Sequence, residues 1–264
     1  MSPPGDESSA DVGGPAREFI LETKDLRKEF RGFVAVNGVE LHVRTGTIHA
    51  LIGPNGAGKT TVFNLLTRFV PASSGTITFK GVDITHERPA QVARRGIARS
   101  FQISAVFPNL TVLENVRVAL QRRLNNSFHF WQSRRALDVL DGRAHELLEG
   151  VGMGELHGRV AIELPYGRKR ALEIATTLAL DPELLLLDEP TAGMGHEDVA
   201  RVSALIRKVA QGRTVLMVEH NLSMVAELAD RITVLSRGSV LSEGSYAEVS
   251  RDPAVLEAYI GGSS

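Results

Sequence analysis

The residues with the clearest chemical potential form a glycine-rich loop. The run Gly53-Pro54-Asn55-Gly56-Ala57-Gly58-Lys59-Thr60 matches the phosphate-loop pattern G-x-x-x-x-G-K-[ST] at every required position. Its glycines let backbone N–H groups face a phosphate, Lys59 supplies a positive charge, and the Thr60 hydroxyl is a ligand type for Mg²⁺. A chance glycine-rich turn is the alternative, at about one in a hundred. The loop therefore predicts a binding site for ATP and Mg²⁺, and the adjacent Thr61 is predicted to belong to the same site.

A second group consists of two acids that end an apolar run. Leu184–Leu187 precedes Asp188 and Glu189, and the run alone is compatible with a buried strand that meets solvent. Beside a phosphate loop, Asp188 is suited to hold Mg²⁺. Glu189 points the opposite way, toward the γ-phosphate, where it can polarise a water molecule. This pair therefore predicts hydrolysis.

His220 follows another apolar run, Thr214–Val218. A lone histidine is more often structural than catalytic. At the end of a strand in the same sheet, however, it faces the nucleotide edge. We expect it to bridge the γ-phosphate and Glu189, and we expect structural roles for the other seven of the eight histidines.

The elements that must position these residues alternate between strands and helices. This order predicts an α/β fold with a covered parallel sheet. Strands are expected at 19–33 (ending in a turn), 34–43, 47–52, 76–79, 184–187, 214–218, 232–235 and 240–241. Helices are expected at 60–69, 170–179, 198–210, 222–229 and 246–260, the last interrupted at Asp252-Pro253.

Residues 111–148 carry long amphipathic stretches, 113–124 and 134–148, with little β-signal. We interpret them as the centre of a helical subdomain inserted at 103–163. The first 17 residues are rich in Pro, Gly, Ser and acids and are expected to be a disordered tail. Residues 262–264 form a second tail, which leaves 18–261 as the main domain.

Composition excludes several classes. Lys and Arg total 30 against 31 Asp and Glu, which gives a net charge of −1 and no sign of a nucleic-acid surface. There are no cysteines, so disulfides and thiolate chemistry are excluded. No apolar run reaches the roughly 18 residues of a membrane span, so we expect any link to a membrane to run through a partner protein.

Together these motifs resemble the ATP-binding subunits of ABC transporters, over 21–261. The resemblance implies a P-loop NTPase parallel core, an N-terminal antiparallel β part and a helical subdomain. It also implies that Gln102 reaches Mg²⁺ and the attacking water and faces a permease, and that His220 is the switch histidine. Phe30 matches the aromatic residue that stacks on adenine, with Phe33 as the alternative, and Val36 completes that contact.

Leu164-Pro165-Tyr166-Gly167-Arg168 matches the signature motif, which is L-S-G-G-Q in most members. The resemblance implies that Leu164, Pro165, Tyr166 and Gly167 contact the γ-phosphate held by an opposite subunit. Pro165 removes a hydroxyl and an N–H, Arg168 adds charge, and Gly195 stands where many members have Asp. These departures favour a heterodimer whose other ATPase subunit has an intact motif.

Three stretches resemble the branched-chain amino acid importer ATPases: 164–167, 218–221 and 252–261. The likeness implies permease partners, an extracytoplasmic solute-binding protein and a peripheral position on the cytoplasmic face of the membrane. Related importers carry amides or urea. The alternatives are a lipid or lipopolysaccharide exporter, a non-transport ABC ATPase acting on DNA or ribosomes, and a regulatory module. The last of these is expected to lack Glu189.

Overall fold

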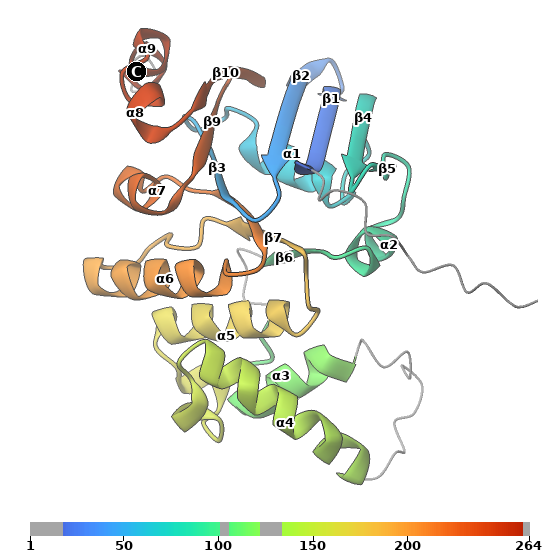
Figure 1. The fold of residues 1–264 in the computed structure, drawn as a ribbon, viewed down its shortest axis with the longest axis vertical. Helices are drawn as coiled ribbons and strands as arrows, with labels where there is room; N and C mark the ends of the chain where they lie inside the picture. The colour runs from blue at the N-terminus through green and yellow to red at the C-terminus, as the bar shows by residue number, and fades with distance from the viewer. Residues whose placement is uncertain (1–17, 101–105, 122–133, 261–264) are drawn as a thin grey trace, which may run out of the picture.

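The computed structural model describes residues 18–100, 106–121 and 134–260. Figure 1 shows strands in the upper half and stacked helices below. One sheet has the order β10-β9-β3-β8-β7-β6. Its neighbouring strands are parallel except for the β9–β10 pair. These strands are Ser239–Gly244 (β10), Arg231–Ser236 (β9), Ile48–Ile52 (β3), Thr214–Val218 (β8), Leu184–Asp188 (β7) and Ile97–Ser100 (β6).

The second sheet is antiparallel and has the order β2-β1-β4-β5. Its strands are Phe33–Arg44 (β2), Phe19–Phe30 (β1), Ser74–Phe79 (β4) and Val82–Asp83 (β5). The predicted α/β class, with a parallel core and an N-terminal antiparallel part, is therefore confirmed.

The central strands are buried on both faces because their alternate side chains enter two different cores. In β8, Val215 and Met217 belong to the core shared with the lower helices. Leu216 and Val218 belong to the core beneath the antiparallel sheet and helix α1 (Lys59–Leu66). This two-sided burial explains why these strands are continuous apolar runs in the sequence.

The lower helices form stacked layers. In Figure 1, α5 (Tyr166–Leu178) lies between α6 (His196–Val209) and the pair α3 (Val112–Gln121) and α4 (Arg134–Gly150). Arg117 of α3 pairs with Asp141 of α4. The remaining helices are α2 (Pro89–Arg94), α7 (Leu222–Leu228), α8 (Tyr246–Val249), α9 (Pro253–Ile260) and two short 3-10 turns, Gly154–Leu156 and Ala161–Glu163. Within the described ranges, every helix is too short or too polar to cross a membrane.

Some elements differ from the expectations. Strand β6 and helix α2 were not predicted, and α5 begins at Tyr166 rather than at Arg170. The predicted break at Asp252-Pro253 separates α8 from α9. The predicted tails, 1–17 and 262–264, lie outside the described residues. The boundaries of the helical insertion, 103–163, stay a prediction.

A chain of polar side chains runs from the buried His49 on β3 to the edge strand β10. This β3 residue is fully buried, with its Nε2 atom 2.8 Å from Thr233 Oγ1. The Thr233 hydroxyl donates to Glu243 Oε2 (2.8 Å), and Arg231 Nε donates to Glu243 Oε1 (2.6 Å). Burial lowers the pKa of His49 to about 4; the Glu243 carboxylate opposes this shift and the Arg231 charge adds to it. His49 is therefore neutral in the folded protein at neutral pH.

This burial predicts acid sensitivity. The unfolded chain binds a proton at His49 near pH 6.5, whereas the folded chain excludes it until about pH 4. The free energy of unfolding should therefore be fully retained above pH 6.5 and fall as the pH drops toward 4. The loss over that window is about 3 kcal/mol.

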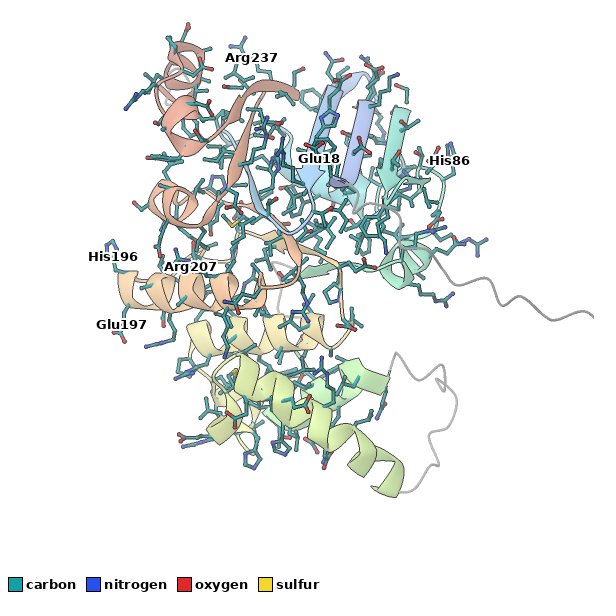
Figure 2. All side chains as sticks on the ribbon, in the orientation of Figure 1. Glu18, His86, His196, Glu197, Arg207 and Arg237 are labelled. Atoms are coloured by element: carbon teal, nitrogen blue, oxygen red, sulfur yellow. The ribbon has the colours of Figure 1, made fainter. Side chains whose placement is uncertain are left out.

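Urea unfolding at a series of pH values measures this loss. The variant His49→Gln keeps a donor toward Thr233 and does not titrate, so it should lose the extra slope in this window. The matched control is the same substitution at His86, which is exposed and lies at the edge of the molecule in Figure 2. Equal slopes for wild type and His49→Gln would contradict the assignment.

Candidate nucleotide-binding site

The glycine-rich loop connects β3 to α1 and needs glycine at both ends. Gly53 and Gly58 have φ values of 148° and 101°. A Cβ atom at Gly53 would lie 2.1 Å from the carbonyl oxygen of Leu235, and one at Gly58 would lie 2.6 Å from that of Ala35. A side chain at either position would displace the backbone. The loop is therefore held in its curled form by the chain that packs behind it.

Lys59 is buried and turned back onto its own loop. Its Nζ atom donates to the carbonyl oxygens of Gly53 (2.7 Å) and Pro54 (2.9 Å). Burial lowers the pKa of Lys59, and the negative charges of Glu189 and Asp188 oppose that shift. The lysine and the two predicted acids therefore lie within electrostatic reach of one another.

Asp188 is the last residue of β7 and is 1% exposed. Its Oδ2 atom accepts from Arg99 Nη2 (2.5 Å), and its backbone carbonyl accepts from Arg170 Nη2 (3.0 Å). Arg99 also donates to Asn64 Oδ1 (2.7 Å). Sequence reasoning missed Arg99, because an arginine in a short mixed strand carries no signal of its own.

The other carboxylate oxygen of Asp188, Oδ1, is buried and has no hydrogen-bond partner among the residues that the structure describes. Thr60, at the start of α1, is exposed. A carboxylate and a hydroxyl are the hard oxygen ligands that Mg²⁺ takes, together with water and substrate phosphates. Across the described ranges, no three His, Asp or Glu side chains form a metal cluster. The donor set thus fits a Mg²⁺ ion that is held partly by a nucleotide.

Glu189 follows β7 in the left-handed region, with φ 45°. Its backbone N–H donates to the carbonyl of Val218 (2.9 Å), so the turn is tied to the end of β8. The Glu189 Oε1 atom lies 2.8 Å from Nε2 of His220. The structure therefore brings together the two side chains that were predicted to act as a pair. A left-handed non-glycine residue is strained, which is a common property of functional sites.

The three residues predicted to contact adenine have different environments. Phe30 is 44% exposed, and the Lys28 ammonium lies 4.8 Å from its ring centroid. Phe33 is 68% exposed. Val36 is fully buried, in the core beneath Gly58. Its side chain packs in this core, and its contact with adenine stays a prediction.

The signature residues lie at the start of α5, in the helical layers of Figure 1. Pro165 occupies the N-cap position and its carbonyl accepts from the N–H groups of Arg168 and Lys169, both at 3.0 Å. Leu164 and Gly167 are buried, whereas Tyr166 is 57% exposed. The helix thus begins directly after the proline, at Tyr166. Gln102 lies outside the described residues.

The C-terminal helix also reaches the glycine-rich loop. Burial raises the pKa of Tyr259, a residue of α9, and a hydrogen bond from the backbone of Gly53 opposes this shift. No sequence motif indicated this contact, because the two residues are far apart in the chain.

Comparisons with known proteins show the family to which this chain belongs. The family model described as ABC transporter matches residues 36–192. The ATP-binding protein BraF of high-affinity branched-chain amino acid transport in Pseudomonas aeruginosa is 38% identical over 252 residues, 92% of this chain and 98% of that protein. The chain belongs to the ABC transporter family. As an ABC ATPase it binds nucleotide and hydrolyses ATP in support of transport.

Another relative, two solved structures and a second family model are also similar to this ABC ATPase. LivG of Escherichia coli, which has the same description as BraF, is 37% identical over 249 residues, 92% of this chain and 98% of that protein. A solved nucleotide-free ATP-binding cassette of an ABC transporter has a TM-score of 0.81 and 30% identity, and a cassette in the ADP conformation has 0.82 and 31%. Each pairing covers 92% of this chain and 99% of the other. A family model described as Branched-chain amino acid ATP-binding cassette transporter matches residues 239–263.

The buried pair of Arg99 and Asp188 predicts a large stability effect. The two side chains are 8% and 2% exposed, so Arg99→Leu leaves a carboxylate buried without its cation. The free energy of unfolding should fall by about 3–5 kcal/mol, as measured by urea denaturation.

Arg207 is the matched control for this change. It pairs with Glu227 at the surface, where the side chains are 55% and 53% exposed, and Figure 2 shows Arg207 on α6. Arg207→Leu should cost at most about 1 kcal/mol. A similarly small loss for Arg99→Leu would show that the buried pair does not hold Asp188 in place.

Proposed function

We propose that this ABC ATPase hydrolyses ATP at the edge where β3, β7 and β8 end. The observation that carries the proposal is the 2.8 Å contact between Glu189 and His220, beside a lysine whose pKa responds to Glu189. In this proposal ATP and Mg²⁺ are held by Gly53, Pro54, Asn55, Gly56, Ala57, Gly58, Lys59, Thr60, Thr61, Gln102 and Asp188. Phe30 stacks on the adenine.

Each residue has a distinct task in the reaction. The Lys59 ammonium group gives up its hydrogen bonds to the carbonyl oxygens of Gly53 and Pro54 and binds the β and γ phosphates instead. Glu189 accepts a proton from a water molecule whose oxygen attacks the γ-phosphorus, while the bond to the β–γ bridging oxygen breaks and ADP leaves. His220 holds Glu189 on one side and the γ-phosphate on the other. Asp188, Thr60 and Gln102 would hold Mg²⁺, which would supply positive charge to neutralise the phosphates.

The second part of the proposal is a head-to-tail pair of ATPase subunits. Residues 164–167 contact the γ-phosphate held by the partner subunit, and the partner's signature motif contacts the ATP held here. Pro165 supplies no N–H, so this composite contact is weaker than one from an intact motif. That asymmetry favours a heterodimer. ATP binding closes the pair, hydrolysis reopens it, and the cycle moves the attached permeases.

The third part is the cargo. BraF and LivG are named for high-affinity branched-chain amino acid transport, which supports import of branched-chain amino acids or related small amides. Such an importer places this chain on the cytoplasmic face of the membrane, with permease subunits and an extracytoplasmic solute-binding protein. Purification through a tag on this chain should recover permeases and a second ATPase. ATP turnover should then rise with a cargo-loaded binding protein, and a complex that needs no such protein would favour an exporter.

Glu189→Gln tests the hydrolytic assignment. The amide keeps the shape of the side chain but cannot accept the proton, so phosphate release should fall by about 10²–10⁴-fold. ATP affinity should stay within about twofold, because Lys59 and the loop are unchanged. Phosphate release and nucleotide binding are measured on the same preparation. Undiminished phosphate release would exclude Glu189 as the base.

A further inference from the structure

A second glutamate lies next to the proposed catalytic pair. Glu219 directly follows β8, precedes His220 and is 3% exposed. Removing a carboxylate from water is strongly unfavourable unless its oxygens accept hydrogen bonds from the protein. The position of Glu219 therefore demands a set of donors around it.

Four hydrogen bonds from two loops meet this demand. Oε1 of Glu219 accepts from the backbone N–H of Thr191 (2.9 Å) and from the Thr191 hydroxyl. Oε2 accepts from the backbone N–H groups of His220 (2.8 Å) and Asn221 (3.0 Å). Both oxygens are thus occupied, one by the loop after β7 and the other by the loop after β8.

The same two loops carry the catalytic pair. Thr191 lies two residues beyond Glu189 and is itself buried, and His220 is one of the Glu219 donors. The side chains of His220 and Glu189 are 43% and 21% exposed. A contact between such exposed groups is weak by itself. The buried carboxylate beneath it supplies the rigid support that the exposed contact lacks.

The support extends to the next helix. Asn221 caps α7, because its Oδ1 atom accepts from the backbone N–H of Met224 (3.1 Å). Glu219 therefore fixes the backbone on both sides of the His220 ring, between the end of β8 and the start of α7. Three backbone donors and one hydroxyl leave the carboxylate little freedom to move.

We propose that Glu219 is a positioning residue, which joins the loops after β7 and β8 so that His220 is held against Glu189. The proposal rests on the proposed roles of Glu189 and His220. Glu219 itself is too deeply buried to touch the nucleotide. It acts through His220, and its removal should misplace the histidine ring and slow hydrolysis without weakening ATP binding.

Glu219→Gln is the direct test, in the full-length chain purified with its transporter partners. The amide nitrogen brings a donor to a position surrounded by donors. We expect kcat to fall about 10²-fold and the Kd for ATP to stay within about twofold. Glu243→Gln is the matched control, because Glu243, like Glu219, accepts from a threonine hydroxyl on one oxygen and has its other oxygen occupied, here by Arg231, but lies outside the nucleotide site. Its kcat should stay within about twofold of wild type. An unchanged kcat for Glu219→Gln would overturn the proposal.

Thr191 provides a milder pair of variants if Glu219→Gln folds poorly. Thr191→Val has the same shape but lacks the hydroxyl, and it should lower kcat by about fivefold. Thr191→Ser keeps the hydroxyl and should stay near wild type. Equal kcat values for the two variants would contradict the role of this hydrogen bond.

A double-mutant cycle separates positioning from general support of the fold. If Glu219 acts through His220, Glu219→Gln should lower single-turnover rates by less than about twofold in a His220→Ala background. An equal loss in both backgrounds would overturn the proposal. Glu189→Gln reports independently on the proposed function. Full turnover in that variant would reject the hydrolytic pair, whereas additivity between Glu219 and His220 would reject only the positioning role.

Discussion

Three neighbouring parallel strands end level with one another, and the site depends on this constraint. In the β3–β8 pair Leu51 lies beside Val218, and in the β7–β8 pair Asp188 lies beside Val218. The loops that follow these strands therefore meet at one edge of the sheet, as in other open α/β sheets. One supplies Lys59, the next supplies the two acids, and the third supplies His220. The apolar strands are buried in two cores, so the polar groups collect where the strands stop.

Buried charge gives this edge its rigidity. Asp188 is held by Arg99 through its side chain and by Arg170 through its carbonyl. Glu219 is held by four donors from two loops. Glu189 and His220 are more exposed and lie above these supports. Buried, tightly held carboxylates below more accessible catalytic side chains suit a site that must exchange ATP for ADP while keeping its geometry.

The sequence predicted those features of the site that depend only on residues adjacent in the chain. Each of these features is a run of adjacent residues: the glycine-rich loop, the apolar strands β7 and β8, and the two acids at the end of β7. Their placement therefore needed no tertiary information. Arg99 and Glu219 were missed because their partners, Asp188 and Thr191, lie 89 and 28 residues away. Strand β6 was missed because a short strand with arginine and serine lacks apolar alternation.

The central claim is that a curled backbone and one lysine grip a triphosphate together with magnesium. Calorimetric titration of the full-length chain with a non-hydrolysable ATP analogue, with Mg²⁺ and then with a chelator, tests this most directly. Saturable binding that requires Mg²⁺, and that disappears in Lys59→Ala, is the result we expect. Absence of binding by the wild-type protein, or binding that Lys59→Ala leaves unchanged, would contradict the account.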